Sequence, residues 1–152
     1  MKIKLIFLSI LLLCFLPLFG MHTADFLDSA INIAASGTAT NGSEFTSNEL
    51  DVETPMQKRL RPGAIIITFT RAAGTASTVD FEFEVSYDRG ATWASFEGVK
   101  IEVATNHVVV SGTTVRVHKE IYFYGVSFIR LHSIKNNDST NGITACNAIL
   151  SL

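Results

Sequence analysis

Apolar and polar residues alternate along most of the chain after residue 60, with the two-residue period of a β-strand. In residues 80–87 (DFEFEVSY), aromatic and aliphatic side chains share one face, and acidic and hydroxyl side chains share the other. Because successive side chains of a strand point to opposite faces, this segment predicts a half-buried antiparallel strand. Residues 64–70 (AIIITFT) are apolar or β-branched almost throughout, which predicts a central strand covered on both faces.

The same pattern continues toward the C-terminus, with turn-forming residues between the segments. Five further strands are predicted, at residues 99–103, 107–110, 114–124, 126–134 and 143–152. Residues 25–60 give a weaker signal, with candidate strands at 29–35 and 48–52 separated by a polar stretch. Eight or nine short strands at this spacing predict an all-β fold, an antiparallel β-sandwich of jelly-roll or immunoglobulin-like kind. The pattern does not decide between these topologies.

A separate apolar run opens the chain. Residues 5–20 carry no charge and follow a basic start with Lys2 and Lys4, which is typical of a secretory signal peptide. As a helix this run would span about 24 Å, short of the ~30 Å hydrocarbon core of a membrane. We therefore expect residues 1–24 to be a leader and the remainder to be exported, with a membrane contact only if the leader stays uncleaved. A translation start at Met21 is the alternative.

The length of the chain predicts a single domain, which the sequence pattern divides into three parts. These are the leader at 1–24, N-terminal strands with a connecting loop at 25–60, and a sandwich core at 61–152. Without the leader the chain holds ten basic and fourteen acidic residues, a formal net charge of −4. It contains no basic run, so we expect no nucleic-acid partner. Cys146 would be the remaining cysteine, so no intramolecular disulfide is expected.

Residues 86–93 (SYDRGATW) form the most specific local motif. Asp88 and Gly90 bracket a tight turn, where a carboxylate accepts hydrogen bonds from N–H groups and glycine adopts a positive φ without steric cost. Thr92 and Trp93 are expected to begin the return strand, with Trp93 folded over the hairpin. The octapeptide resembles the Asp-box, S-x-D-x-G-x-T-W, of sialidases and related β-propellers, where it staples a hairpin far from the active site. We interpret the four residues as structural, and this single motif does not support a glycosidase.

One face of residues 114–124 is the candidate contact surface with another molecule. It carries polar and aromatic side chains at alternate positions: Arg116, His118, Glu120, Tyr122 and Tyr124. The tyrosines, beside Arg116 and His118, could stack on a sugar ring or anchor a partner protein. The alternative is that a second element of the same chain covers this face. Lys119 falls on the opposite, apolar face, which indicates a bulge or a guarded edge strand.

The sequence predicts no catalytic, cofactor or metal site. Three histidines lack the spacing of metal ligands: His107, His118 and His132. Three acidic residues share one strand face and are interpreted as solvated rather than as a Ca²⁺ site: Asp80, Glu82 and Glu84. Residues 136–142 (NNDSTNG) are interpreted as an Asx-rich turn. We expect the protein not to be an enzyme, and a hydrolase is the least favoured class.

Residues 61–152, from RPGAIIITF to ITACNAILSL, resemble small β-rich proteins found among tailed-phage virion genes. In such proteins a strand, an Asp-box-like hairpin and a closing Asn/Asp-turn hairpin form a compact sandwich that decorates a larger assembly. The resemblance implies a structural or adhesive role in a virion, with self-association or a larger protein assembly as the partner. The leader departs from this pattern. The alternative function is an exported carbohydrate-binding module with Tyr122, Tyr124 and Trp93 as the stacking platform.

Overall fold

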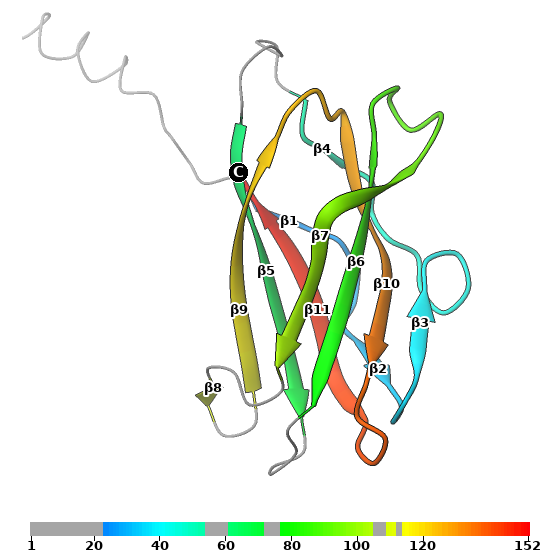
Figure 1. The fold of residues 1–152 in the computed structure, drawn as a ribbon, viewed down its shortest axis with the longest axis vertical. Helices are drawn as coiled ribbons and strands as arrows, with labels where there is room; N and C mark the ends of the chain where they lie inside the picture. Colours follow the sequence, from blue (N-terminus) through cyan, green and yellow to red (C-terminus); the bar gives the residue numbers. More distant parts are fainter. Residues whose placement is uncertain (1–22, 54–60, 72–76, 105–108, 112–113) are drawn as a thin grey trace, which may run out of the picture.

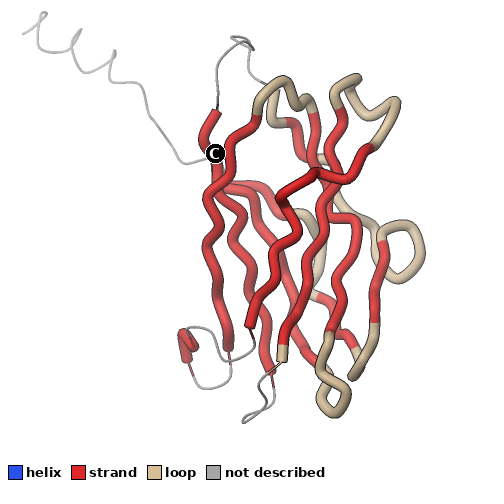
Figure 2. Tube along the Cα trace, viewed as in Figure 1, coloured by secondary structure: helices blue, strands red, loops and turns tan. Residues whose placement is uncertain are grey.

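The structure of the protein is a computed structural model that describes residues 23–53, 61–71, 77–104, 109–111 and 114–152. Two antiparallel β-sheets make up these residues. Figure 2 shows strands joined by loops, and these residues contain no helix. The predicted all-β sandwich is therefore confirmed. Within these ranges no helix offers the length and apolar character of a membrane span. Most of the expected leader, residues 1–22, lies outside the described residues.

The first sheet, here called the β5 sheet, contains six strands of the described chain. They are β1 (Thr23–Asp25), β2 (Ile31–Ile33), β5 (Arg61–Arg71), β8 (Val109–Ser111), β9 (Thr114–Phe123) and β11 (Ile143–Ser151). Their order is β1-β11-β5-β9-β8, and β2 also pairs with β11. The long strands β11, β5 and β9 form the centre, and the short strands lie at the edges.

The second sheet, here called the β6 sheet, contains five strands of the described chain. They are β3 (Thr38–Thr40), β4 (Leu50–Asp51), β6 (Thr78–Ser86), β7 (Ala94–Ala104) and β10 (Phe128–Asn136). Their order is β3-β10-β6-β7, and β4 also pairs with β10. β3 lies inside the stretch expected to be a polar connection, so the sequence pattern missed this strand; three residues are too few to show an alternating period.

The connections between the strands give the sandwich a jelly-roll topology. The chain crosses from one sheet to the other after β2, β4, β5, β7, β9 and β10, and β6 and β7 form a hairpin within one sheet. Counted with β1–β2 and β3–β4 as interrupted strands, this is the strand order of a jelly roll rather than of an immunoglobulin domain.

The N-terminal segment is part of this sandwich and not an appendage. β1 and β2 complete the β5 sheet, and β3 and β4 complete the β6 sheet. β1 begins at Thr23, inside the range assigned to the leader, and pairs Thr23 with Ser151 and Asp25 with Ile149. The strands of residues 25–60 and those of residues 61–152 therefore share the same two sheets.

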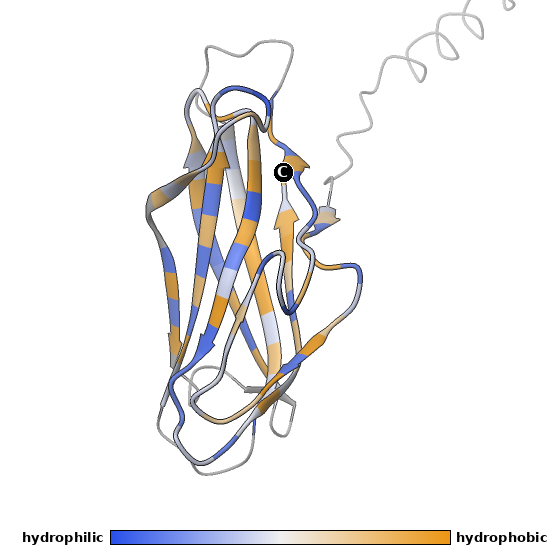
Figure 3. Cartoon of the chain, turned by 90° about the vertical axis from the view of Figure 1, so that its right-hand side faces the viewer, coloured by the Kyte–Doolittle hydropathy of each residue, from blue (hydrophilic) through white to orange (hydrophobic). Residues whose placement is uncertain are grey.

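Hydrophobic and hydrophilic residues alternate along several strands, as the orange and blue bands in Figure 3 show, and the buried apolar side chains form the core between the sheets. Phe69 of β5 and Phe81 of β6 stack across the interface, with ring centroids 6.3 Å apart. The inward residues Ile65, Ile67 and Phe69 are fully buried, whereas the outward residues of β5 are half-buried. The expectation that this strand is covered on both faces is therefore wrong, because a two-layer sandwich leaves its outer faces to solvent.

The closing turn between β10 and β11 has the predicted Asx-rich architecture. The Asp138 carboxylate accepts hydrogen bonds from the backbone N–H groups of Thr140 and Asn141, at 2.8 and 2.9 Å. Asn136 is buried and donates from Nδ2 to the carbonyl oxygens of Ala34 and Asn141. These side chains satisfy backbone groups that a turn leaves unpaired, so this turn is structural.

Candidate functional site

The octapeptide 86–93 forms a hairpin held by its own side chains. The Asp88 carboxylate accepts hydrogen bonds from the Thr92 hydroxyl at 2.6 Å and the Thr92 N–H at 2.8 Å. Ser86, expected to be an ordinary polar strand residue, donates its hydroxyl to Asp88 and accepts from the Gly90 N–H at 2.7 Å. The Thr92 bonds, with a smaller contribution from Ser86, lower the pKa of Asp88 to about 2.

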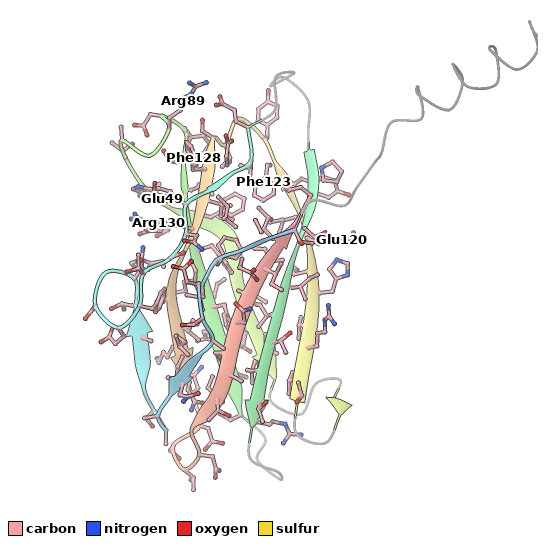
Figure 4. All side chains as sticks on the ribbon, turned by 180° about the vertical axis from the view of Figure 1, so that it is seen from behind. Glu49, Arg89, Glu120, Phe123, Phe128 and Arg130 are labelled. Atoms are coloured by element: carbon pink, nitrogen blue, oxygen red, sulfur yellow. The ribbon has the colours of Figure 1, made fainter. Side chains whose placement is uncertain are left out.

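The turn itself uses two positive-φ residues. Gly90 has φ of +86° and Arg89 has φ of +58°. The positive φ expected at Gly90 is present, and a side chain at that φ would strain the backbone. Arg89 projects from the tip, as Figure 4 shows, and pairs with Glu53 at 3.1 Å.

Trp93 lies on the outer surface and not over a buried core. It precedes the first residue of β7, Ala94, and it is half-buried. The guanidinium carbon of Arg130 lies 4.0 Å from the centroid of its ring, a cation–π contact. Arg130 donates to Glu84 from Nε and Nη2, at 2.9 and 2.8 Å, and also lies near Glu49. The Trp93 ring lies beside Gly90 of the turn, as expected, but it is half-buried rather than fully covered, and Arg130 of β10 packs on its face.

The acidic face of β6 is paired with basic residues rather than solvated throughout. Asp80 is 5% exposed and receives Lys100 Nζ at 2.9 Å and Asn137 Nδ2 at 3.1 Å. This contact raises the pKa of Lys100. Glu84 is held by Arg130 and lies 3.1 Å from His132 Nδ1. The interpretation as a solvated face is therefore wrong for Asp80.

The outer face of β9 is open to solvent. The side chains expected on this face are all exposed: Arg116, His118, Glu120, Tyr122 and Tyr124. The two tyrosines are 61% and 72% exposed. No described element covers them, so the alternative of a covered face is wrong for the part of the chain that the structure describes. Figure 4 places Glu120 on the opposite side of the molecule from Arg130.

A depression of about 270 Å³ lies on this outer face, between β5 and β9. Pro62 and Ala64 of β5 stand opposite Tyr122 and Glu120 of β9 in the antiparallel register. Ser151 of β11 stands opposite Ala64 on the other side. Short side chains on β5 beside long side chains on β9 create the hollow, which the sequence alone could not show because it depends on the register.

Among the described residues, β9 is also an open edge of the sheet over most of its length. Of the described strands, β8 pairs with the first two residues of β9, Thr114 and Val115. Lys119 points toward the inner side of this edge and is exposed, while β5 and β9 pair without a register shift. The expected bulge is therefore absent from this pairing, and Lys119 is the inward charge of a guarded edge strand.

The structure does not assemble the three-aromatic platform. Trp93 lies on the outer face of the β6 sheet against Arg130, and Tyr122 on the outer face of the β5 sheet. The histidines do not meet either, since His118 is on β9 and His132 on β10, and His107 lies outside the described residues. Among the described residues, no group of three or more His, Cys, Asp or Glu side chains could hold a metal ion.

Comparison with protein-family models gives no match, and comparison with curated proteins gives no significant match.

Proposed function

We propose that this protein is a non-enzymatic interaction protein, a surface or decoration subunit of a virion or extracellular assembly, and that it associates through the outer face of β9. The observation that carries the proposal is the pair of exposed tyrosines, Tyr122 and Tyr124, at the end of a strand that forms an open edge in the described part of the chain. Tyrosines are enriched at protein interfaces because each offers a large apolar ring with a polar tip.

The contact uses side chains and not strand pairing. An edge strand can join a neighbour by backbone hydrogen bonds, but an inward charge disfavours that arrangement. Lys119 supplies such a charge at the middle of β9. Tyr122 and Tyr124 instead point outward, and Arg116 and Glu120 on the same face provide opposite charges for a polar rim.

The resemblance of residues 61–152 to tailed-phage virion proteins supports an assembly role, and the apolar run at 5–20 supports export. These two observations favour different locations for the protein: the resemblance favours a virion, and the apolar run favours the exterior of the cell. The intact mass of the native protein separates them, because an exported subunit lacks the leader and a virion subunit begins at Met1 or Met21.

Light scattering across a concentration series tests the association. The parent protein should gain mass above that of one chain as its concentration rises. The double variant Tyr122→Ala/Tyr124→Ala should remain a monomer. Tyr87→Ala is the matched control, because Tyr87 is 60% exposed but lies in the 86–93 hairpin. A parent that stays monomeric at every concentration and binds no other component would overturn the proposal.

A further inference from the structure

We infer that the depression between β5 and β9 is a binding site for one ring of a neutral glycan. The inference rests on the proposed function, because it names a partner class for the same outer face of β9. The volume of about 270 Å³ lies just below the ~300–1,000 Å³ of pockets that enclose drug-sized ligands. A hollow of this size, open on one side, admits one ring of a chain and leaves the rest in solvent.

The register of three strands arranges the lining groups around one point. Ala64 on β5 forms the floor, with Glu120 opposite it on β9 and Ser151 opposite it on β11. Directly opposite residues have Cβ atoms ~4.5–5.5 Å apart. A six-membered ring resting over Ala64 therefore lies within reach of the carboxylate on one side and the Ser151 position on the other.

The side chains that line the depression suit both the apolar C–H groups and the hydroxyl groups of a sugar. Tyr122 is 61% exposed, so a face of its ring is open to the apolar C–H groups of a pyranose. The Glu120 carboxylate accepts hydrogen bonds from neighbouring hydroxyls, and such charge-assisted bonds are the strong ones. His118 lines the same hollow and adds a ring nitrogen that donates or accepts. A neutral glycan is the ligand class that presents an apolar face and several hydroxyls together.

A cationic side chain is the competing occupant, since an aromatic ring beside a carboxylate also attracts ammonium and guanidinium groups. The glycan is favoured because two exposed polar side chains, His118 and Glu120, border the floor, with the nearly buried Ser151 at its edge, and one cation would use a single carboxylate. An anionic sugar is disfavoured by Glu120.

An array of neutral hexose and N-acetylhexosamine oligosaccharides, probed with the native protein, tests the inference. The strongest array glycan is then titrated by calorimetry, beside a lysine-rich peptide. Binding should be saturable and should weaken at least about tenfold in Tyr122→Ala and in Glu120→Gln, the effect of losing one charge-assisted hydrogen bond or stacked ring. Tyr87→Ala should bind as the parent does, and thermal melts should show that all three variants fold.

Each contrary result has a distinct meaning. Glycan binding unchanged in both Tyr122→Ala and Glu120→Gln would overturn the site, as would an array without signal or a preference for the lysine-rich peptide. If the array is blank but Tyr122→Ala/Tyr124→Ala still abolishes self-association, the glycan inference fails and the proposed function stands. If neither glycan binding nor self-association is found, both fail.

Discussion

At the scale of single residues, the ionised carboxylate of Asp88 stabilises the hairpin at 86–93 through its hydrogen bonds. The hydrogen bonds from Thr92 and Ser86 lower the pKa of Asp88 from its ordinary value of 3.8 to about 2. Because the folded state lowers this pKa, ionised Asp88 stabilises the protein above pH 3.8, and that contribution is lost as the pH falls toward 2.

Asp88→Asn tests this pH dependence. The variant should melt below the parent at pH 6, because the amide replaces a doubly accepting carboxylate. The gap between the two melting temperatures should close as the pH falls from about 4 to about 2, where Asp88 of the parent is protonated. Thermal melts at a series of pH values measure the gap. A gap of constant size across this range would show that the Asp88 charge contributes no stability.

Trp93 and Gly90 should each contribute to the free energy of unfolding, but by different mechanisms. Gly90→Ala forces a side chain into φ of +86° and should cost ~1 kcal/mol or more. Trp93→Ala removes a half-buried ring and its contact with Arg130, so it should cost about 1–3 kcal/mol, below the ~3–5 kcal/mol of a core aromatic. Urea unfolding measures both, with Tyr87→Ala as the exposed control. A Trp93→Ala cost equal to that of a core aromatic would contradict its place on the surface.

Prediction from sequence worked at this scale where the cause was local. The positive φ of Gly90 and the bonds of Asp88 follow from a few consecutive residues. The contact of Trp93 with Arg130 could not be predicted in this way, because Arg130 lies on β10 and is brought near by the pairing of β6 with β10. Ser86 was missed because a buried hydroxyl has the same sequence signal as a solvated one.

At the scale of elements, the long strands were predictable and the short ones were not. β5, β6, β9, β10 and β11 each have nine or more residues, long enough for an alternating or continuously apolar pattern to be visible in the sequence. β1 and β3 have three residues each, and pairing with β11 and β10 defines them. The prediction that the outer face of β5 is covered was wrong, because apolar, β-branched residues also suit a strand with one half-buried face.

The charge of Lys119 should prevent the β9 edges of two molecules from pairing. Lys119→Val should remove the inward charge from the β9 edge and let edges of two molecules pair, so that association exceeds that of the parent. Lys119→Glu is the matched control, because it retains an inward charge and should behave as the parent does. Light scattering, with the infrared band of intermolecular β-sheet, measures the effect. Equal behaviour of Lys119→Val and Lys119→Glu would show that Lys119 does not guard the edge.

At the scale of the whole molecule, the β1 strand limits where a leader can be removed. Thr23 and Ala24 pair with Ser151 and Leu150, so cleavage after Ala24 would take away two of the three β1 residues. We therefore expect an exported form to begin no later than Thr23, as cleavage after Gly20 would leave it. Intact mass spectrometry of the native protein identifies this end. A mature chain that begins at Asp25 would show that β1 is dispensable.

The jelly-roll topology was beyond sequence reasoning, because strand order depends on contacts between distant segments and not on the period within one. The same limit applies to the surface that we propose as the interface. The sequence placed Tyr122 and Tyr124 on one face of a strand, but only the fold shows that no described element covers that face.

Hydroxyl-radical footprinting of the three tyrosines tests the central claim most directly. The chain contains three tyrosines, Tyr87, Tyr122 and Tyr124, and all are exposed in the single molecule. If the protein associates through the outer face of β9, Tyr122 and Tyr124 should lose reactivity as the protein concentration rises, while Tyr87 in the same molecules stays reactive. Equal reactivity of all three at every concentration, or protection of Tyr87 alone, would contradict the account.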